Sequence, residues 1–291
     1  MASACPIPSR DRARARGVSP RRIPSREPIP RRPGGDRPRE AYPRRHHRLG
    51  AWGTAFASLV AEAGGSATIW ARRAEVAEEI NTGANERYLP GLRLPAGVRA
   101  TTDMSAAASG AEMVVVAVPS QAARGIVAPL AGRLEEGAAV VSLMKGIELG
   151  TGMRMSEVMG QALDAGPERL AVVSGPNLAD EIAARQPTAT VIAAADEDLA
   201  ARVAAACATA AFRPYTNTDV LGVELCGAVK NVIALAVGMA AGRGYGDNSK
   251  ATIITRAWWR SPAWAWPWAR APRPSRAWPG WETSWPPAPR P

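Results

Sequence analysis

Residues 112–118 have the sequence E-M-V-V-V-A-V, in which branched apolar residues follow one another without alternation. A continuous run of this kind predicts a strand that is buried on both faces, as strands of parallel sheets are. Apolar runs of similar character predict three more strands, over 67–70, 139–143 and 170–174. Helical patterns are predicted over 54–63 and 74–82. The alternation of strands and helices predicts an α/β fold with a doubly wound, mostly parallel sheet and helices on both faces.

The pattern changes at residue 220, where V-L-G-V-E-L-C-G-A-V-K-N-V-I-A-L-A-V-G-M-A-A-G begins. The run is apolar and rich in helix-forming Ala and Leu, so it predicts a long helix. We therefore expect a sheet domain over 49–216 and the start of a helical domain over 217–256.

The two ends of the chain differ in composition from this middle part. Residues 1–48 hold 14 arginines against 4 acidic residues, with many prolines and almost no apolar periodicity. Residues 257–291 hold 8 of the 10 tryptophans and 9 prolines. The net charges of the first segment, the middle and the last are +10, −4 and +4, so the basic character resides in the ends. We expect both ends to lie outside the packed fold, because neither can offset its conformational entropy by burial.

Several classes of protein are disfavoured by the composition. An uninterrupted apolar stretch of about 18 residues is absent, which argues against a membrane-spanning helix. The arginine-rich start lacks the apolar core of a secretory signal. The three cysteines, Cys5, Cys207 and Cys226, lack the spacing of a zinc site or a disulfide framework. We therefore expect no metal, and a reducing cytoplasm is the expected location.

Residues 49–55, L-G-A-W-G-T-A, lie at the start of the first predicted helix. Gly50 and Gly53 have the spacing of the last two glycines in G-x-G-x-x-G, a loop that approaches a dinucleotide pyrophosphate at a helix N-terminus. Arg48 stands where the first glycine belongs, so an ordinary glycine-rich turn is the alternative.

A pair of arginines, Arg72 and Arg73, follows the strand predicted over 67–70. They lie about 20 residues after the glycine loop, at the position that contacts the adenosine ribose of a bound dinucleotide. Paired arginines suit the 2′-phosphate of NADP, and a solvated helix start is the alternative.

Two of the chain's three lysines have unusual surroundings. Lys145 follows the strand predicted over 139–143, at the carboxyl end where open α/β sheets bind ligands. Lys230 interrupts an apolar helix, where burial would lower its pKa and suit it to proton transfer. A solvated strand end and a snorkelling side chain are the respective alternatives. In the turn S-G-P-N-L-A, residues 174–179, backbone N–H groups are expected to face an anion.

Together these motifs resemble the bacterial NAD(P)-dependent glycerol-3-phosphate dehydrogenase family over about residues 49 to 256. The resemblance rests on W-G-T-A, A-R-R, N-E-R-Y-L-P-G, V-P-S, K-G-I-E, S-G-P-N-L-A, G-A-V-K-N and G-D-N-S-K-A-x-I-I-T-R in this order. It implies a Rossmann domain, here without its first strand, followed by an all-helical substrate domain. It also implies a cytoplasmic oxidoreductase acting on a CH–OH group. Such an enzyme interconverts dihydroxyacetone phosphate and sn-glycerol 3-phosphate for glycerophospholipid synthesis, with NADP or NAD as cofactor.

The resemblance further implies roles for individual residues. Lys230 matches the catalytic lysine, the proton donor or acceptor for the C2 oxygen. Substrate contacts are implied for Lys145, Gly175, Asn177, Lys230 and Asn231. Cofactor contacts are implied for Gly50, Trp52, Gly53, Arg72, Arg73, Tyr88, Lys145 and Ala179. The expected partner is a small molecule, with a homodimer as one possible assembly and without nucleic acid or membrane insertion.

The chain departs from the family pattern at both ends. An apolar first strand and the first glycine are missing before residue 49. The family's later segments, including a G-D-L aspartate and S-R-N-R, are missing after Arg256. A one-base shift of codons for a family-like peptide yields the sequence found at 257–270. We therefore hypothesise that 1–48 and 257–291 are out of frame, and we expect the activity of this chain to be low or absent.

Three other interpretations stay open. A related 3-hydroxyacid dehydrogenase would share the two-domain plan and a Lys-Asn catalytic pair, and assays with dihydroxyacetone phosphate and 3-hydroxyacids distinguish the two. A non-enzymatic remnant is the second. The third is a nucleic-acid-binding arm over 1–48, which its arginine content allows but its proline content disfavours.

Overall fold

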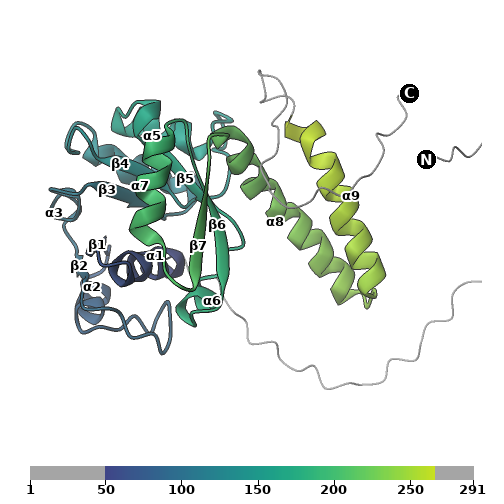
Figure 1. The fold of residues 1–291 in the computed structure, drawn as a ribbon, viewed down its shortest axis with the longest axis horizontal. Helices are drawn as coiled ribbons and strands as arrows, with labels where there is room; N and C mark the ends of the chain where they lie inside the picture. The colour runs from purple at the N-terminus through teal and green to yellow at the C-terminus, as the bar shows by residue number, and fades with distance from the viewer. Residues whose placement is uncertain (1–49, 266–291) are drawn as a thin grey trace, which may run out of the picture. The chain divides into compact units, whose positions relative to one another are not determined.

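The structure is a computed structural model that describes residues 50–265 (Figure 1). The sequence-based expectations for 1–48 and for 266–291 lie outside these residues. The strands are β1 Ala67–Trp70, β2 Val98–Thr101, β3 Met113–Val116, β4 Ala139–Ser142, β5 Leu170–Ser174, β6 Thr188–Ala194 and β7 Phe212–Asn217. The helices are α1 Ala51–Glu62, α2 Ala74–Asn81, α3 Met104–Ala108, α4 Ala123–Val127, α5 Met155–Leu163, α6 Ala179–Ala183, α7 Glu197–Cys207, α8 Val220–Gly242 and α9 Asp247–Ala265. Short 3₁₀ helices are η1 Ser120–Ala122, η2 Ala128–Leu130 and η3 Pro167–Arg169.

The strands form a two-stranded sheet, β1-β2, and a five-stranded sheet in the order β3-β4-β5-β6-β7. All pairs are parallel except β5 with β6, in which Ala171 lies opposite Ala194. The prediction of a doubly wound, mostly parallel α/β sheet is thus confirmed. The strands β2, β6 and β7 were not among those predicted.

Successive residues of the central strands pack against helices on opposite faces of the sheet, as the period of two requires. On one face Val141 and Val173 pack with Phe56 of α1 and Leu199 of α7. On the other face Val140 packs with residues of α4 and α5. Both faces of β4 and β5 are therefore covered, and every residue of these two strands is buried.

The prediction that the 112–118 strand is buried on both faces is wrong in part. In β3 only Val116 is buried, and Met113, Val114 and Val115 are half-buried. Within the described residues β3 pairs with β4 alone, and β1 pairs with β2 alone. An edge strand covered on one side by a neighbour keeps part of its side chains accessible, which explains the difference.

Helix α8 begins at Val220 because the Asp219 side chain caps it, accepting a hydrogen bond from the backbone N–H of Gly222 at 2.8 Å. It runs for 23 residues and lies beside α9 (Figure 1). By length and composition alone α8 could cross a membrane, although only 28% of the relevant window is buried in the protein. The expectation that composition argues against such a helix is therefore not upheld, although one such helix is weak evidence of membrane insertion.

Helix α9 crosses the boundary predicted at residue 257. It extends to Ala265, so the first nine residues of the tryptophan-rich segment are helical rather than irregular. Adding residues to an existing helix is far easier than nucleating one, which accounts for the continuation. The sequence-based domain limits at 217 and 256 otherwise remain predictions.

Candidate functional site

Two lysine side chains meet at one backbone oxygen at the carboxyl edge of the five-stranded sheet. Lys145 follows β4 and Gly175 follows the adjacent parallel strand β5, so both residues lie at the same edge of the sheet. The Lys145 Nζ donates a hydrogen bond to the Gly175 carbonyl oxygen at 3.1 Å. The Lys230 Nζ, from α8, donates to the same oxygen at 2.6 Å. The three residues that the sequence analysis singled out separately therefore lie together.

The proximity of two ammonium groups is electrostatically costly, and the lysines respond to it. Burial, reinforced by the positive charge of Lys230, lowers the pKa of Lys145 to about 8 from 10.5. Burial also lowers the pKa of Lys230. Both side chains can therefore gain or lose a proton closer to neutral pH than an ordinary lysine does.

A glycine allows α8 to approach the sheet closely enough for this arrangement. A Cβ atom at Gly227 would lie 2.6 Å from Ser174 Oγ, at the carboxyl end of β5. A Cβ atom at that separation would force the Ser174 hydroxyl to move, so Gly227 favours the close crossing of helix and strand. Lys230 lies three residues further along α8, on the turn that follows this contact.

The turn after β5 carries further predicted site residues. Asn177 Nδ2 donates to Thr190 Oγ1 at 3.0 Å, and the Thr190 hydroxyl donates to the Ser174 carbonyl oxygen at 3.1 Å. Asn177 Oδ1 is buried and has no hydrogen-bond partner among the described residues. Ala179 begins α6 and is half-buried. Asn231, by contrast, is exposed, and among residues 50–265 no hydrogen bond joins its side chain to this turn.

The glycine loop adopts a backbone shape that suits an anion. Gly50 is the N-cap of α1 with φ 114°, in the left-handed region, and no side chain caps this helix. A Cβ at Gly50 would lie 3.1 Å from the Tyr88 ring, and a Cβ at Gly53 would lie 3.2 Å from Ala117 Cβ. Since Ala117 follows β3 and β3 pairs with β4, the loop lies at the same edge of the sheet as Lys145.

The residues expected near the adenosine differ in their surroundings. Arg73 Nη2 donates to the Tyr88 hydroxyl at 3.2 Å, which brings these two side chains to Gly50. Arg72 is exposed. Trp52 packs edge-on against Phe56, with ring centroids 5.7 Å apart, and its buried indole N–H has no partner within the described part of the chain.

One contributor to the loop was missed by the sequence analysis. Asn85 is 1% exposed, and its Nδ2 donates to Thr54 Oγ1 at 2.9 Å. The Thr54 hydroxyl donates in turn to the Gly50 carbonyl oxygen at 3.0 Å. This relay fixes the first turn of α1. The signal in the sequence is the asparagine of N-E-R-Y-L-P-G, whose side chain cannot be buried without a hydrogen bond.

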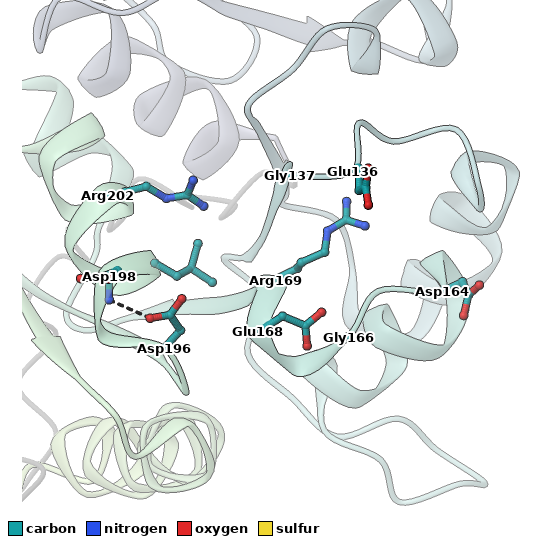
Figure 2. Close-up of a pocket in the computed structure, with 10 residues that line it drawn as sticks. Glu136, Gly137, Asp164, Gly166, Glu168, Arg169, Asp196, Asp198 and Arg202 are labelled. Atoms are coloured by element: carbon teal, nitrogen blue, oxygen red, sulfur yellow. Dashed lines mark hydrogen bonds between the residues drawn. The ribbon is translucent and has the colours of Figure 1, made fainter.

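A cavity of about 610 Å³ lies elsewhere, at the opposite edge of the sheet (Figure 2). It is lined by residues that precede β4 and β5 and by those that follow β6: Glu136, Gly137, Asp164, Gly166, Glu168, Arg169, Asp196, Asp198, Leu199 and Arg202. None of the predicted site residues lines it. Parallel α/β sheets bind ligands at the carboxyl ends of their strands, so this cavity is not the candidate site.

Two parts of the chain match the models of one protein family. Residues 49–200 match the N-terminal part of the family described as NAD-dependent glycerol-3-phosphate dehydrogenase, which is more than half of the chain. This chain belongs to that family. Residues 219–259 match the family's C-terminal part, three residues beyond the limit inferred from the motifs.

Individual relatives show how far the similarity extends. The chain is 57% identical over 208 residues to glycerol-3-phosphate dehydrogenase [NAD(P)+] of Streptomyces coelicolor, a match covering 71% of this chain and 62% of the relative. It is 56% identical over 209 residues to the enzyme of that name from Thermobifida fusca, with the same coverage. The crystal structure of glycerol-3-phosphate dehydrogenase from Coxiella burnetii superposes with a TM-score of 0.70 at 31% identity. That match covers 75% of this chain and 67% of the other. The chain thus spans about 62% of the length of its curated relatives.

The residues present fit the NAD(P) cofactor of this family. Gly50 leaves the backbone open at an uncapped helix N-terminus, and the first turn of α1 contains no acidic residue that would repel a pyrophosphate. The indole N–H of Trp52, which has no hydrogen-bond partner among the described residues, belongs to the same turn. Gly50, Trp52 and Gly53 would hold the pyrophosphate, and Arg72 and Arg73 would contact the adenosine ribose.

The lowered pKa of Lys145 predicts a pH-dependent stability. Between about pH 8 and 10.5 Lys145 is more protonated in the unfolded chain than in the folded one, so the contribution of Lys145 to the free energy of unfolding rises with pH in this window. Lys145→Met removes the buried charge and should raise the free energy of unfolding at about pH 7 by of order 1–3 kcal/mol. This gain should shrink as the pH rises from 8 toward 10.5.

Urea unfolding followed by circular dichroism at several pH values checks this. Lys250→Met, which removes an ammonium from α9 beside Asp247, is the matched control and should give no gain at about pH 7. A gain for Lys145→Met that is independent of pH would contradict the assignment.

Proposed function

We propose that this chain is an NAD(P)-dependent oxidoreductase that interconverts dihydroxyacetone phosphate and sn-glycerol 3-phosphate, a step that supplies glycerophospholipid synthesis. The observation that carries the proposal is the pair Lys145 and Lys230 on the Gly175 carbonyl oxygen. The pair lies at the edge of the sheet that also carries the glycine loop of Gly50. Family membership and the names of the relatives support the same activity.

The proposed mechanism assigns the proton and the developing charge to different groups. The cofactor, when bound, supplies or removes the hydride at C2. During reduction the Lys230 Nζ gives a proton to the C2 oxygen, and during oxidation it takes the proton back. The Lys145 ammonium stabilises the negative charge that develops on that oxygen. A lysine of lowered pKa suits this task, because its ammonium group gives up a proton more readily than that of an ordinary lysine.

The substrate phosphate is assigned to the turn after β5. We assign it to the backbone near Gly175 and to Asn177, whose Oδ1 has no partner in the described residues and whose amide group can rotate to donate. Asn231 belongs to the same proposal, although its present exposure requires a rotamer change to reach the turn. No metal is required by this scheme.

The proposal extends to the setting of the enzyme. The described cysteines, Cys207 and Cys226, are free, which is compatible with a reducing cytoplasm. A homodimer is the proposed assembly, because α8 exposes Val232, Leu235 and Met239 at spacings suited to helix pairing.

The assay that tests the function joins residues 50–259 to the flanking segments of the Streptomyces coelicolor relative. The chimera should oxidise NADPH with dihydroxyacetone phosphate and not with the keto forms of 3-hydroxyacids. Lys230→Met in this chimera should lower turnover roughly 10²–10⁴-fold, because a general acid is lost. The NADPH affinity, measured by fluorescence titration, should stay nearly unchanged.

Several results would refute this assignment. Activity on 3-hydroxyacids alone would favour the related dehydrogenase. Near-normal turnover of the Lys230→Met chimera, or loss of NADPH binding instead of turnover, would remove Lys230 from its role. The unaltered chain measured alongside tests whether its own turnover is low.

The arginines after β1 predict a preference for NADPH. Arg72 and Arg73 offer two positive charges to a 2′-phosphate, and Arg73 is already oriented by the Tyr88 hydroxyl. Replacing both arginines by alanine in the chimera should weaken NADPH binding more than NADH binding. Arg99→Ala, on the neighbouring strand β2, is the control and should alter neither affinity. An equal loss for both cofactors would show that the arginines do not contact the 2′-phosphate.

A further inference from the structure

A buried carboxylate on α8 has no role in the mechanism described above. The Glu224 side chain is 4% exposed, in the second turn of the helix. Its carboxylate accepts hydrogen bonds from Arg154 Nη1 at 2.7 Å, from the Ser156 backbone N–H at 2.8 Å and from the Ser156 hydroxyl at 2.6 Å. An acid buried this deeply would be costly if these donors were lost.

The groups that donate to Glu224 lie at the N-terminus of α5. Helix α5 begins directly after Arg154, whose guanidinium cannot accept hydrogen bonds from the first turn of the helix. The Ser156 N–H is one of the groups there that have no partner within their own helix. Glu224 supplies the missing acceptor from α8, some 70 residues later in the chain. The carboxylate therefore acts as a cap of α5 that is provided by a different helix.

The remaining attachments of α8 to the sheet are concentrated in its first turns. Val223 forms a small buried apolar cluster with Val172 and Ala193. Gly227 lies against Ser174. Beyond Lys230 the helix is mostly exposed, apart from Ile233 and Ala240. The first turns of α8 must therefore hold the whole helix in its register on the sheet.

The spacing along α8 links this attachment to the lysine. Residues 224, 227 and 230 are three apart, so they follow one another around a single face of the helix. Along this face the Glu224 carboxylate contacts α5, Gly227 contacts the end of β5, and the Lys230 ammonium contacts the Gly175 carbonyl oxygen. A rotation or shift of α8 at Glu224 would therefore move Lys230 away from the Gly175 oxygen.

We propose that Glu224 is a positioning residue that, through Arg154 and Ser156 of the α5 N-terminus, holds α8 so that Lys230 stays beside Lys145 on the Gly175 carbonyl. The inference rests on the proposed function, because it concerns the same lysine pair. It is independent of turnover, since it predicts the state of the lysines in the protein without substrate.

The chain offers a direct readout because it contains only three lysines, Lys145, Lys230 and Lys250. Trace acetylation of the full chain with acetic anhydride, followed by peptide mass spectrometry over about pH 6 to 11, gives the midpoint of reactivity for each amine. Lys250 on α9 serves as the internal reference. In the unaltered protein Lys145 should react with a midpoint near pH 8.

Glu224→Gln should change this profile. The variant keeps the shape of the side chain but loses the charge that attracts Arg154. If α8 shifts, Lys145 loses both its cover and its positive neighbour, so its midpoint should rise by about one pH unit or more. Glu157→Gln is the matched control, because Glu157 also pairs with Arg154 at 2.7 Å but lies on α5 itself and does not contact α8 in any described hydrogen bond. Its Lys145 midpoint should stay where it is in the unaltered protein.

Circular dichroism shows whether each variant is folded. If Glu224→Gln does not fold, Ser156→Ala removes only one hydrogen bond to the carboxylate, and it should raise the Lys145 midpoint by a smaller amount. A folded Glu224→Gln with an unshifted Lys145 midpoint, or an unshifted Ser156→Ala where that variant is needed, would overturn the inference. An equal shift in Glu157→Gln would do the same. If Lys145 in the unaltered protein already titrates at the ordinary value for lysine, the paired-lysine site itself fails, and the proposed function fails with it.

Discussion

Strands β4 and β5 are buried at every position, and the parallel pairing between them underlies the rest of the molecule. Two strands covered on both faces require helices on both sides of the sheet, which α1 and α7 provide on one face and α4 and α5 on the other. The parallel direction places the carboxyl ends of both strands at one edge. Lys145 and Gly175 become neighbours for this reason, although 30 residues separate them in the chain.

The lysine pair has a cost that the surrounding structure offsets. Two ammonium groups on one carbonyl oxygen repel each other, and burial weakens their hydration, as the lowered pKa of Lys145 reflects. Ionisable groups with shifted pKa values are common at functional sites. The compensating interactions lie nearby: the apolar layers on β4 and β5, the close approach at Gly227 and the three hydrogen bonds received by Glu224.

Helix α8 leads from the last strand of the sheet to α9, and both of its charged residues lie in its first half. Its apolar length led to the prediction of a long helix, and the same length satisfies the composition of a membrane span. The two charged residues within it, Glu224 and Lys230, both point to partners on the sheet domain. A lone charge in an apolar helix was the signal that identified Lys230. Applied to Glu224, the same signal would have identified the second contact as well.

The sequence by itself determined the strands that are buried throughout, because continuous burial leaves a mostly apolar run without alternation, as in 139–143 and 170–174. It also identified the glycine loop, the family and the two lysines to which we assign the chemistry, since each depends on residue types at short spacing. Strand β7, with the sequence F-R-P-Y-T-N, could not be predicted in this way. It is half-exposed at the sheet edge, and pairing with β6 rather than its own composition makes it a strand.

Tertiary structure alone decided which of the candidate residues meet. The hydrogen bonds of Lys230 to Gly175, of Asn85 to Thr54 and of Glu224 to Ser156 join positions 55, 31 and 68 residues apart. Such contacts depend on the order and direction of strands, which local patterns do not encode. The half-burial of β3 has the same origin, because an apolar run specifies a strand but not the neighbours that cover it. Sequence periodicity shows which residues of a segment must be buried, whereas the order and direction of the strands determine which other segments bury them.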